Sequence, residues 1–107
     1  MRRSADFATV IRSGERTRRG ALVVHHLAEL TPGAEPVVGF VVGKPVGGSV
    51  VRHQVSRRLR AQVAQRLAVL PGGSGTVVRA LEGAADSTSA QLGTDLEAAL
   101  QRLVAVR

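Results

Sequence analysis

The strongest constraint on the fold is a long amphipathic segment in the middle of the chain. From about Ser49 to Leu70, apolar residues recur every four positions, at Val51, Val55, Leu59, Val63 and Leu67. This spacing is typical of a helix that packs one face against a core. The opposite side of the helix, at about 100° per residue, carries His53, Arg57, Arg60 and Ala64. We therefore expect a helix with one buried face and one basic face, ended by Pro71.

Strands are predicted on both sides of this helix. Apolar and β-branched residues predict strands over 21–27, 37–42 and 75–81. The unbroken apolarity of 37–42 predicts burial on both faces, as in a central strand. The polar segment 16–20 is interpreted as a connection, so a fourth strand would require 37–48 to divide in two.

Two further helices complete the predicted order. One covers 4–13, where Ser4 is a suitable N-cap, and the other runs from 87 or 88 to 105. The resulting order is α, β, β, α, β, α, without internal repeats or a linker. It predicts a single α+β domain over 1–107, with helices covering a small sheet.

The charge of the chain is concentrated in its first part. The formal net charge is +7, and residues 1–60 carry all of the excess. Five cations and no acid lie between Lys44 and Arg60, whereas a merely solvated helix usually mixes the two signs. Arginine, which grips phosphate bidentately, supplies fourteen of the fifteen cations. The pattern favours a polyanionic partner, above all nucleic acid.

Several kinds of site are excluded or left open. The absence of cysteine excludes disulfides, thiolate zinc sites and cysteine nucleophiles. His25 and His26 are adjacent in a strand and point to opposite faces, which favours structural roles. Residues 39–44 fall one position short of a phosphate-binding Walker loop, and Pro45 replaces its hydroxyl residue. The turn at 47–49 either binds phosphate through its backbone or is a simple turn.

No carboxylate pair or catalytic triad is suggested by the remaining polar residues. Only two aromatic residues occur, which argues against a reader of single strands that stacks bases on a platform. Phe7 either stacks on a base or packs with Val10 and Ile11 in the core. The apolar run from Val37 to Gly43 is far shorter than the ~20 residues of a spanning helix. We expect a cytoplasmic protein, with binding to an anionic membrane surface as a less favoured alternative.

Three segments together resemble the protein subunit of bacterial ribonuclease P, over about 4–104. They are Asp6-Phe7-x-x-Val10-Ile11-Arg12-x-Gly14, Gly39-Phe40-Val41-Val42-Gly43-Lys44-x-Val46-Gly47, and Val50-Val51-Arg52-His53-Gln54-Val55-Ser56-Arg57-Arg58-Leu59-Arg60. Their order and spacing match that family. The third segment departs from the family pattern at Ser49, His53, Gln54 and Ser56, and so carries fewer cations than usual.

The resemblance implies a fold and a function. The fold is a small mixed four-stranded sheet with three helices, a ribosomal-protein-like two-layer domain with a left-handed βαβ crossover. The function is to assist the catalytic RNA in removing the 5′ leader from precursor tRNA. The resemblance implies that the RNA carries the hydrolysis with its Mg²⁺. It implies no protein-bound cofactor or metal, no membrane, and a protein that is monomeric apart from RNA.

The resemblance also assigns residues to two surfaces. Contact with the catalytic RNA is expected from Lys44, Arg52, His53, Arg57, Arg58 and Arg60. A cleft for the single-stranded 5′ leader is expected from Phe7, Ile11 and Arg12, with Arg18 or Arg19. The alternative function is that of a non-enzymatic, ribosome-associated protein that binds structured RNA.

Overall fold

The computed structural model describes residues 4–104. Three helices and four strands follow in the order α1 (Ser4–Ser13), β1 (Glu15–Arg19), β2 (Leu22–Leu27), β3 (Val37–Val41), α2 (Ser49–Ala64), β4 (Gly75–Ala80) and α3 (Ser89–Val104). Short 3₁₀ helices occur at η1 (Lys44–Val46), η2 (Leu67–Val69) and η3 (Glu82–Asp86). This order confirms the predicted α+β class.

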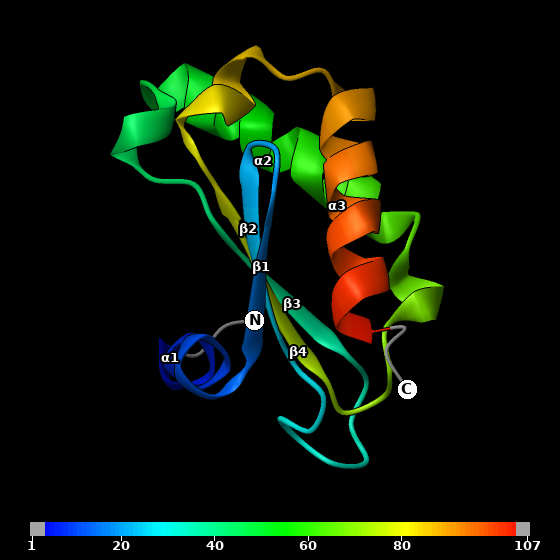
Figure 1. Cartoon of the computed structure of the whole chain (residues 1–107). Helices are drawn as coiled ribbons and strands as arrows, with labels where there is room; N and C mark the ends of the chain where they lie inside the picture. Colours follow the sequence, from blue (N-terminus) through cyan, green and yellow to red (C-terminus); the bar gives the residue numbers. More distant parts are fainter. Residues whose placement is uncertain (1–3, 105–107) are drawn as a thin grey trace.

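The four strands form one mixed sheet in the order β1-β2-β4-β3. β1 and β2 are an antiparallel hairpin whose turn contains Gly20 at a φ of 54°, a conformation that favours glycine. β2 pairs with β4 in antiparallel fashion, and β3 pairs with β4 in parallel. Because α2 joins β3 to β4, these three elements form the βαβ unit that the family resemblance implies (Figure 1).

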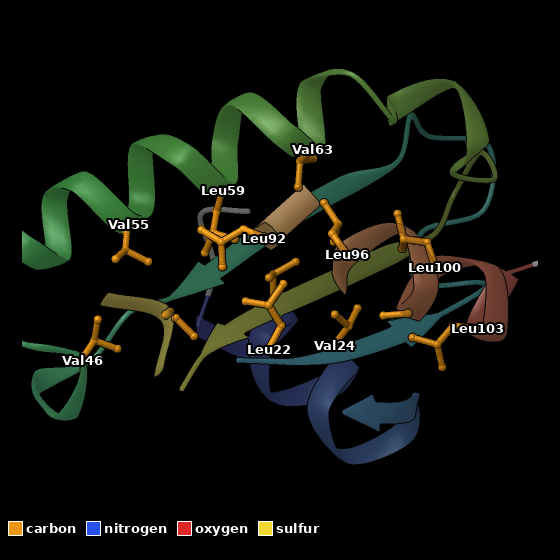
Figure 2. Close-up of a cluster of buried hydrophobic side chains, with 14 of the residues drawn as sticks. Leu22, Val24, Val46, Val55, Leu59, Val63, Leu92, Leu96, Leu100 and Leu103 are labelled. Atoms are coloured by element: carbon orange, nitrogen blue, oxygen red, sulfur yellow. The ribbon is translucent and has the colours of Figure 1, made fainter. Parts of the chain in front are cut away.

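Helices cover the two faces of the sheet unequally. α2 and α3 share one face, where Leu59 and Leu96 are fully buried over Leu22 and Val24 of β2 (Figure 2). α1 lies on the other side of the strands (Figures 1 and 2). There Val10 is the buried residue of the helix. The main core therefore lies between the sheet and two helices, and only a short helix covers part of the opposite face.

The prediction of a polar connection at 16–20 was wrong. Residues 15–19 form β1, an edge strand in which Thr17 is buried and the four other side chains are exposed. Its composition is polar because an edge strand with one inward side chain needs little apolar surface. Hydrogen bonding to β2 supplies the stability that hydrophobic patterning does not reveal. The fourth strand thus does not arise from a division of 37–48.

The prediction that 37–42 is a central strand was also wrong. β3 lies at the edge of the sheet, and β2 and β4 occupy the centre. In β3 Gly39 is the buried residue, and the other four are partly exposed. The apolar run has a different cause, since Val38 and Phe40 pack against the core on the side of α2. Continuous apolarity therefore did not distinguish an edge strand, packed on one side, from a strand with two neighbours.

The long helix is shorter than its pattern predicts. α2 ends at Ala64, and the chain then tightens into η2, so that Leu67 is 47% exposed and leaves the apolar stripe. Leu70 is buried instead. α3 begins at Ser89 behind a capping box: the Thr88 N–H donates to Gln91 Oε1 (2.8 Å), and the Gln91 N–H donates to Thr88 Oγ1 (3.1 Å). The predicted end of this helix at 105 lies outside the described residues.

Candidate nucleic-acid interface

The exposed face of α2 carries a cluster of basic side chains. Val55, Leu59 and Val63 turn inward, whereas His53, Arg57 and Arg60 are exposed. This division confirms the predicted buried and basic faces of the helix. Packing of the apolar stripe fixes the rotation of the helix, and this rotation in turn directs the basic side chains outward.

Among residues 4–104, the basic side chains on this face form no ion pair with an acid. Within residues 4–104 the ion pair that forms is Arg66–Glu97, at 3.3 Å between Nε and Oε1, and it lies near the far end of α2. Arg60 instead lies over the ring of Phe40 in β3, with the guanidinium carbon 5.3 Å from the ring centre. Such a contact orients a cation without cancelling its charge. Arg57 and Arg60 therefore present net positive charge to solvent.

Two further arginines of α2 are only partly exposed. The Nη1 of Arg58 donates a hydrogen bond to the Ser87 carbonyl at 3.1 Å, which ties the helix to the segment before α3. Arg52 is half-buried, and its Nε has no hydrogen-bond partner among the described residues. Of the six residues expected to contact RNA, Arg52 and Arg58 are the two that are partly buried.

The loop before α2 extends the basic face. Lys44 is exposed in η1. Gly48 is the N-cap of α2 and, having no side chain, leaves the first N–H groups of the helix without a side-chain cap. These N–H groups carry the positive end of the helix dipole. Lys44 and the N-terminus of α2 therefore extend the positively charged surface that includes Arg57.

A second candidate surface is the face of the sheet that carries α1. The helix approaches β2 so closely at Gly14 that a Cβ there would lie 2.6 Å from the His26 carbonyl oxygen. Val10 meets β4 at Gly75. Phe7 is half-buried, while Ile11, at 37% exposure, and Arg12 lie at the surface. Of the three apolar residues in the predicted stripe, Val10 enters the core most deeply.

Strand register decides which arginines share this face. Arg16 pairs with His25, and Arg18 pairs with Val23, which pairs in turn with Arg79. Directly paired residues point to the same side of a sheet. Arg19 pairs with Leu22, whose side chain is in the core under α2 and α3. Of the two alternatives for the leader cleft, the register thus favours Arg18 over Arg19.

Sequence reasoning missed Arg16, His25 and Arg79 on this face. Arg16 could have been placed on this face from the alternation of side chains along 15–19, if that segment had been assigned as a strand. His25 is buried between strands, and burial, with Arg79 and Arg16 nearby, lowers its pKa below 6.5. The face therefore combines a buried, uncharged imidazole with the cations beside it.

The second histidine belongs to the opposite face, as predicted from its position. His26 is buried, and its Nδ1 lies 2.9 Å from Thr76 Oγ1 of β4. Among residues 4–104, no three His, Asp or Glu side chains gather in a way that could hold a metal ion. Nor does any helix in this part of the chain have the length and apolarity to cross a membrane.

Comparison with known sequences gives a match along nearly the whole chain. The sequence profile of the family described as Ribonuclease P matches residues 1–104. The ribonuclease P protein component of Streptomyces bikiniensis is 56% identical over 111 aligned positions, covering 97% of this chain and 90% of the relative. The corresponding protein of a Mycobacterium species is 48% identical, with 95% and 86% covered.

Comparison with solved structures supports the fold. The RNase P protein of Staphylococcus aureus has a TM-score of 0.82 at 22% identity, covering 97% of this chain and 95% of that one. The RNase P protein of Thermotoga maritima has a TM-score of 0.78 at 20% identity, with 100% and 96% covered. At such identities these structures bear on the fold alone. Together with the relatives of higher identity, the family profile shows that this chain belongs to the family of bacterial ribonuclease P protein components.

Proposed function

We propose that the chain acts in ribonuclease P by holding two RNAs on two of its surfaces. The exposed face of α2 binds the catalytic RNA, and the α1 face of the sheet binds the 5′ leader of precursor tRNA. Hydrolysis of the phosphodiester bond and the Mg²⁺ that it uses remain with the RNA subunit. The observation that carries this proposal is the unpaired basic face of α2 on a chain that matches the family along its length.

The α2 face suits a structured RNA because its cations sit on a rigid element. Arg57 and Arg60 are one helical turn apart, and Arg60 is oriented by its contact with Phe40. Guanidinium groups held in this way can each meet a phosphate with little loss of side-chain entropy. His53 and Lys44 extend the same surface toward the start of the helix.

The α1 face suits a single strand. Phe7 and Ile11 offer partly exposed apolar surface for a base, and Arg12 lies beside them on the same helix. Arg18 faces the same side of the sheet from β1. A leader without secondary structure can place its bases on the apolar side chains and its phosphates on the arginines.

The net charge of the chain suits a protein that holds two polyanions together. Substrate and catalytic RNA repel each other, and a protein of charge +7 between them offsets part of that repulsion. The holoenzyme should then need less Mg²⁺ to reach the same activity. We propose a cytoplasmic protein that is monomeric apart from RNA, since the surfaces invoked are all used for RNA.

Reconstitution tests this function directly. The protein is added to a bacterial ribonuclease P RNA at low Mg²⁺, and cleavage of a precursor tRNA with a 5′ leader is measured. Faster cleavage that depends on the leader supports the proposal. Binding to the RNA without any change in cleavage would instead favour a ribosome-associated RNA-binding protein. Flotation with anionic vesicles, but no binding to RNA, would favour a membrane-surface role.

A further inference from the structure

The free edge of β1 forms a third basic surface, which shares Arg18 with the proposed leader site and extends beyond both proposed RNA sites. A hollow of about 630 Å³ lies along this edge, lined by Arg16, Thr17, Arg18, Arg19, Val23 and Arg102. Three of the arginines come from β1 itself, and Arg102 reaches the edge from the last turn of α3. We call the four arginines the β1-edge surface.

No acid lines this hollow. Glu15 precedes Arg16 in β1 and lines a smaller, adjoining hollow with Arg16, Arg102 and Leu103. Asp95 of α3 lies against Gly20, the residue that follows Arg19. None of the four arginines of the β1-edge surface forms an ion pair with the described residues. Like charges gathered from two elements repel one another, and an anion bound in the hollow would offset that repulsion.

The second half of the chain also contributes an arginine to this surface. Three of its arginines lie within the described residues, and Arg66 is already paired with Glu97. Of the other two, Arg102 lines the hollow with the arginines of β1, and Arg79 of β4 faces the same side of the sheet as Arg18, two strands away. Arg102 is therefore the described cation of the second half that lies beside the basic strand β1.

Protection of an edge strand from aggregation explains only part of this pattern. Charged side chains on a free edge discourage pairing with another chain. Alternating signs on β1 would achieve the same end, and Arg102 does not belong to the strand. The lining by cations from two elements is better explained by a bound polyanion.

We propose that the β1-edge surface binds the phosphate backbone of the ribonuclease P RNA at a place separate from the α2 face. Arg60 of α2 lies over Phe40 of β3, which is the other edge of the sheet. Three strand spacings, roughly 14 Å, separate β1 from β3. One phosphate cannot meet both surfaces, so the two edges engage different parts of the RNA.

This inference rests on the proposed partner but not on the leader site or on the use of α2. Arg19 and Arg102 are the residues to test, because Arg19 faces away from α1 and Arg102 belongs to α3. Neither residue contributes to the exposed face of α2.

The experiment measures binding of the full chain to a bacterial ribonuclease P RNA, without tRNA, from 50 to 400 mM salt. Removing two phosphate contacts in the R19A/R102A variant should reduce the slope of log K against log salt by about 1.4 to 1.8. The R19K/R102K variant keeps both charges and should keep the slope. Arg66→Gln removes a charge that is already paired with Glu97 and serves as the control. Urea unfolding checks that each variant is folded.

The outcomes separate this inference from the proposed function. An unchanged slope for R19A/R102A, together with a reduced slope for R57A/R60A, would overturn the β1-edge surface and leave the α2 face intact. Unchanged slopes for both double variants would overturn both. A parallel titration adds a precursor tRNA with a 5′ leader. If R19A/R102A weakens binding only in that titration, these arginines belong to the leader site, and a separate surface is overturned. Aggregation of R19A/R102A with an unchanged slope would mean that the arginines only protect the edge.

Discussion

Removal of Arg57 and Arg60 is the sharpest test of the α2 face. Both side chains are exposed, and neither is paired with an acid in the described part of the chain. If each meets one phosphate of a helical RNA, the slope of log K against log salt changes by about 0.9 per arginine. The R57A/R60A variant should therefore lose about 1.8 from this slope. If both proteins bind equally at 1 M salt, binding of the variant at 0.1 M salt is roughly 60-fold weaker, a difference of about 2.5 kcal/mol.

The assay is a filter-binding titration of a bacterial ribonuclease P RNA at several salt concentrations. Arg57→Ala and the control Arg66→Gln each reduce the formal net charge from +7 to +6. If the face of α2 meets phosphate, only the first change alters the slope by about one. Arg60→Ala also removes the contact with Phe40, so its unfolding free energy is measured in parallel.

Two results would refute this reasoning. Equal slope changes for Arg57→Ala and Arg66→Gln would mean that binding responds to net charge alone and not to a defined face. An unchanged slope for R57A/R60A would mean that the basic face of α2 is merely solvated.

Three further changes test the fold. Leu59→Ala removes a fully buried side chain and should lower the unfolding free energy by about 2–5 kcal/mol in urea titrations. Gly14→Ala places a methyl group 2.6 Å from the His26 carbonyl oxygen and should cost about 1–3 kcal/mol, whereas Gly48→Ala meets open space and should have little effect. Because burial lowers the pKa of His25 below 6.5, the unfolded chain binds more protons, and stability should fall as pH drops below about 6.5. The variant His25→Gln should flatten that pH dependence, and an unflattened profile would assign it to another group.

The periodicity of the sequence predicted the elements that bury one face and expose the other, above all the helix α2. The four-residue spacing of Val55, Leu59 and Val63 identified the inward side of α2, and the burial of these residues agrees. That spacing also predicted the exposed positions of His53 and Arg57, because a rigid helix fixes both faces at once. The basic half of the candidate site could thus be derived from sequence.

The errors have a common cause, since edge strands depend on their neighbours more than on their own composition. β1 is polar and was not recognised, and β3 is apolar and was assigned to the centre. Without β1, the register that separates Arg18 from Arg19 was unknown. Arg79 and Arg102 could not be assigned to a surface either, because their positions follow from sheet order and helix packing. Sequence motifs therefore identified one surface in detail and left the others incomplete.

The layered arrangement of helix, sheet and helix affects the electrostatic repulsion between two RNAs bound on its opposite sides. α1 and α2 lie on opposite sides of the strands (Figure 2). The shortest dimension of the molecule is 20 Å. The Debye length at physiological salt is about 8 Å. Phosphates held on the two sides would be more than two screening lengths apart, with a cationic layer between them. The thickness of the protein would then act as a spacer, so that a leader and a ribozyme can be joined in one particle without direct contact of their backbones.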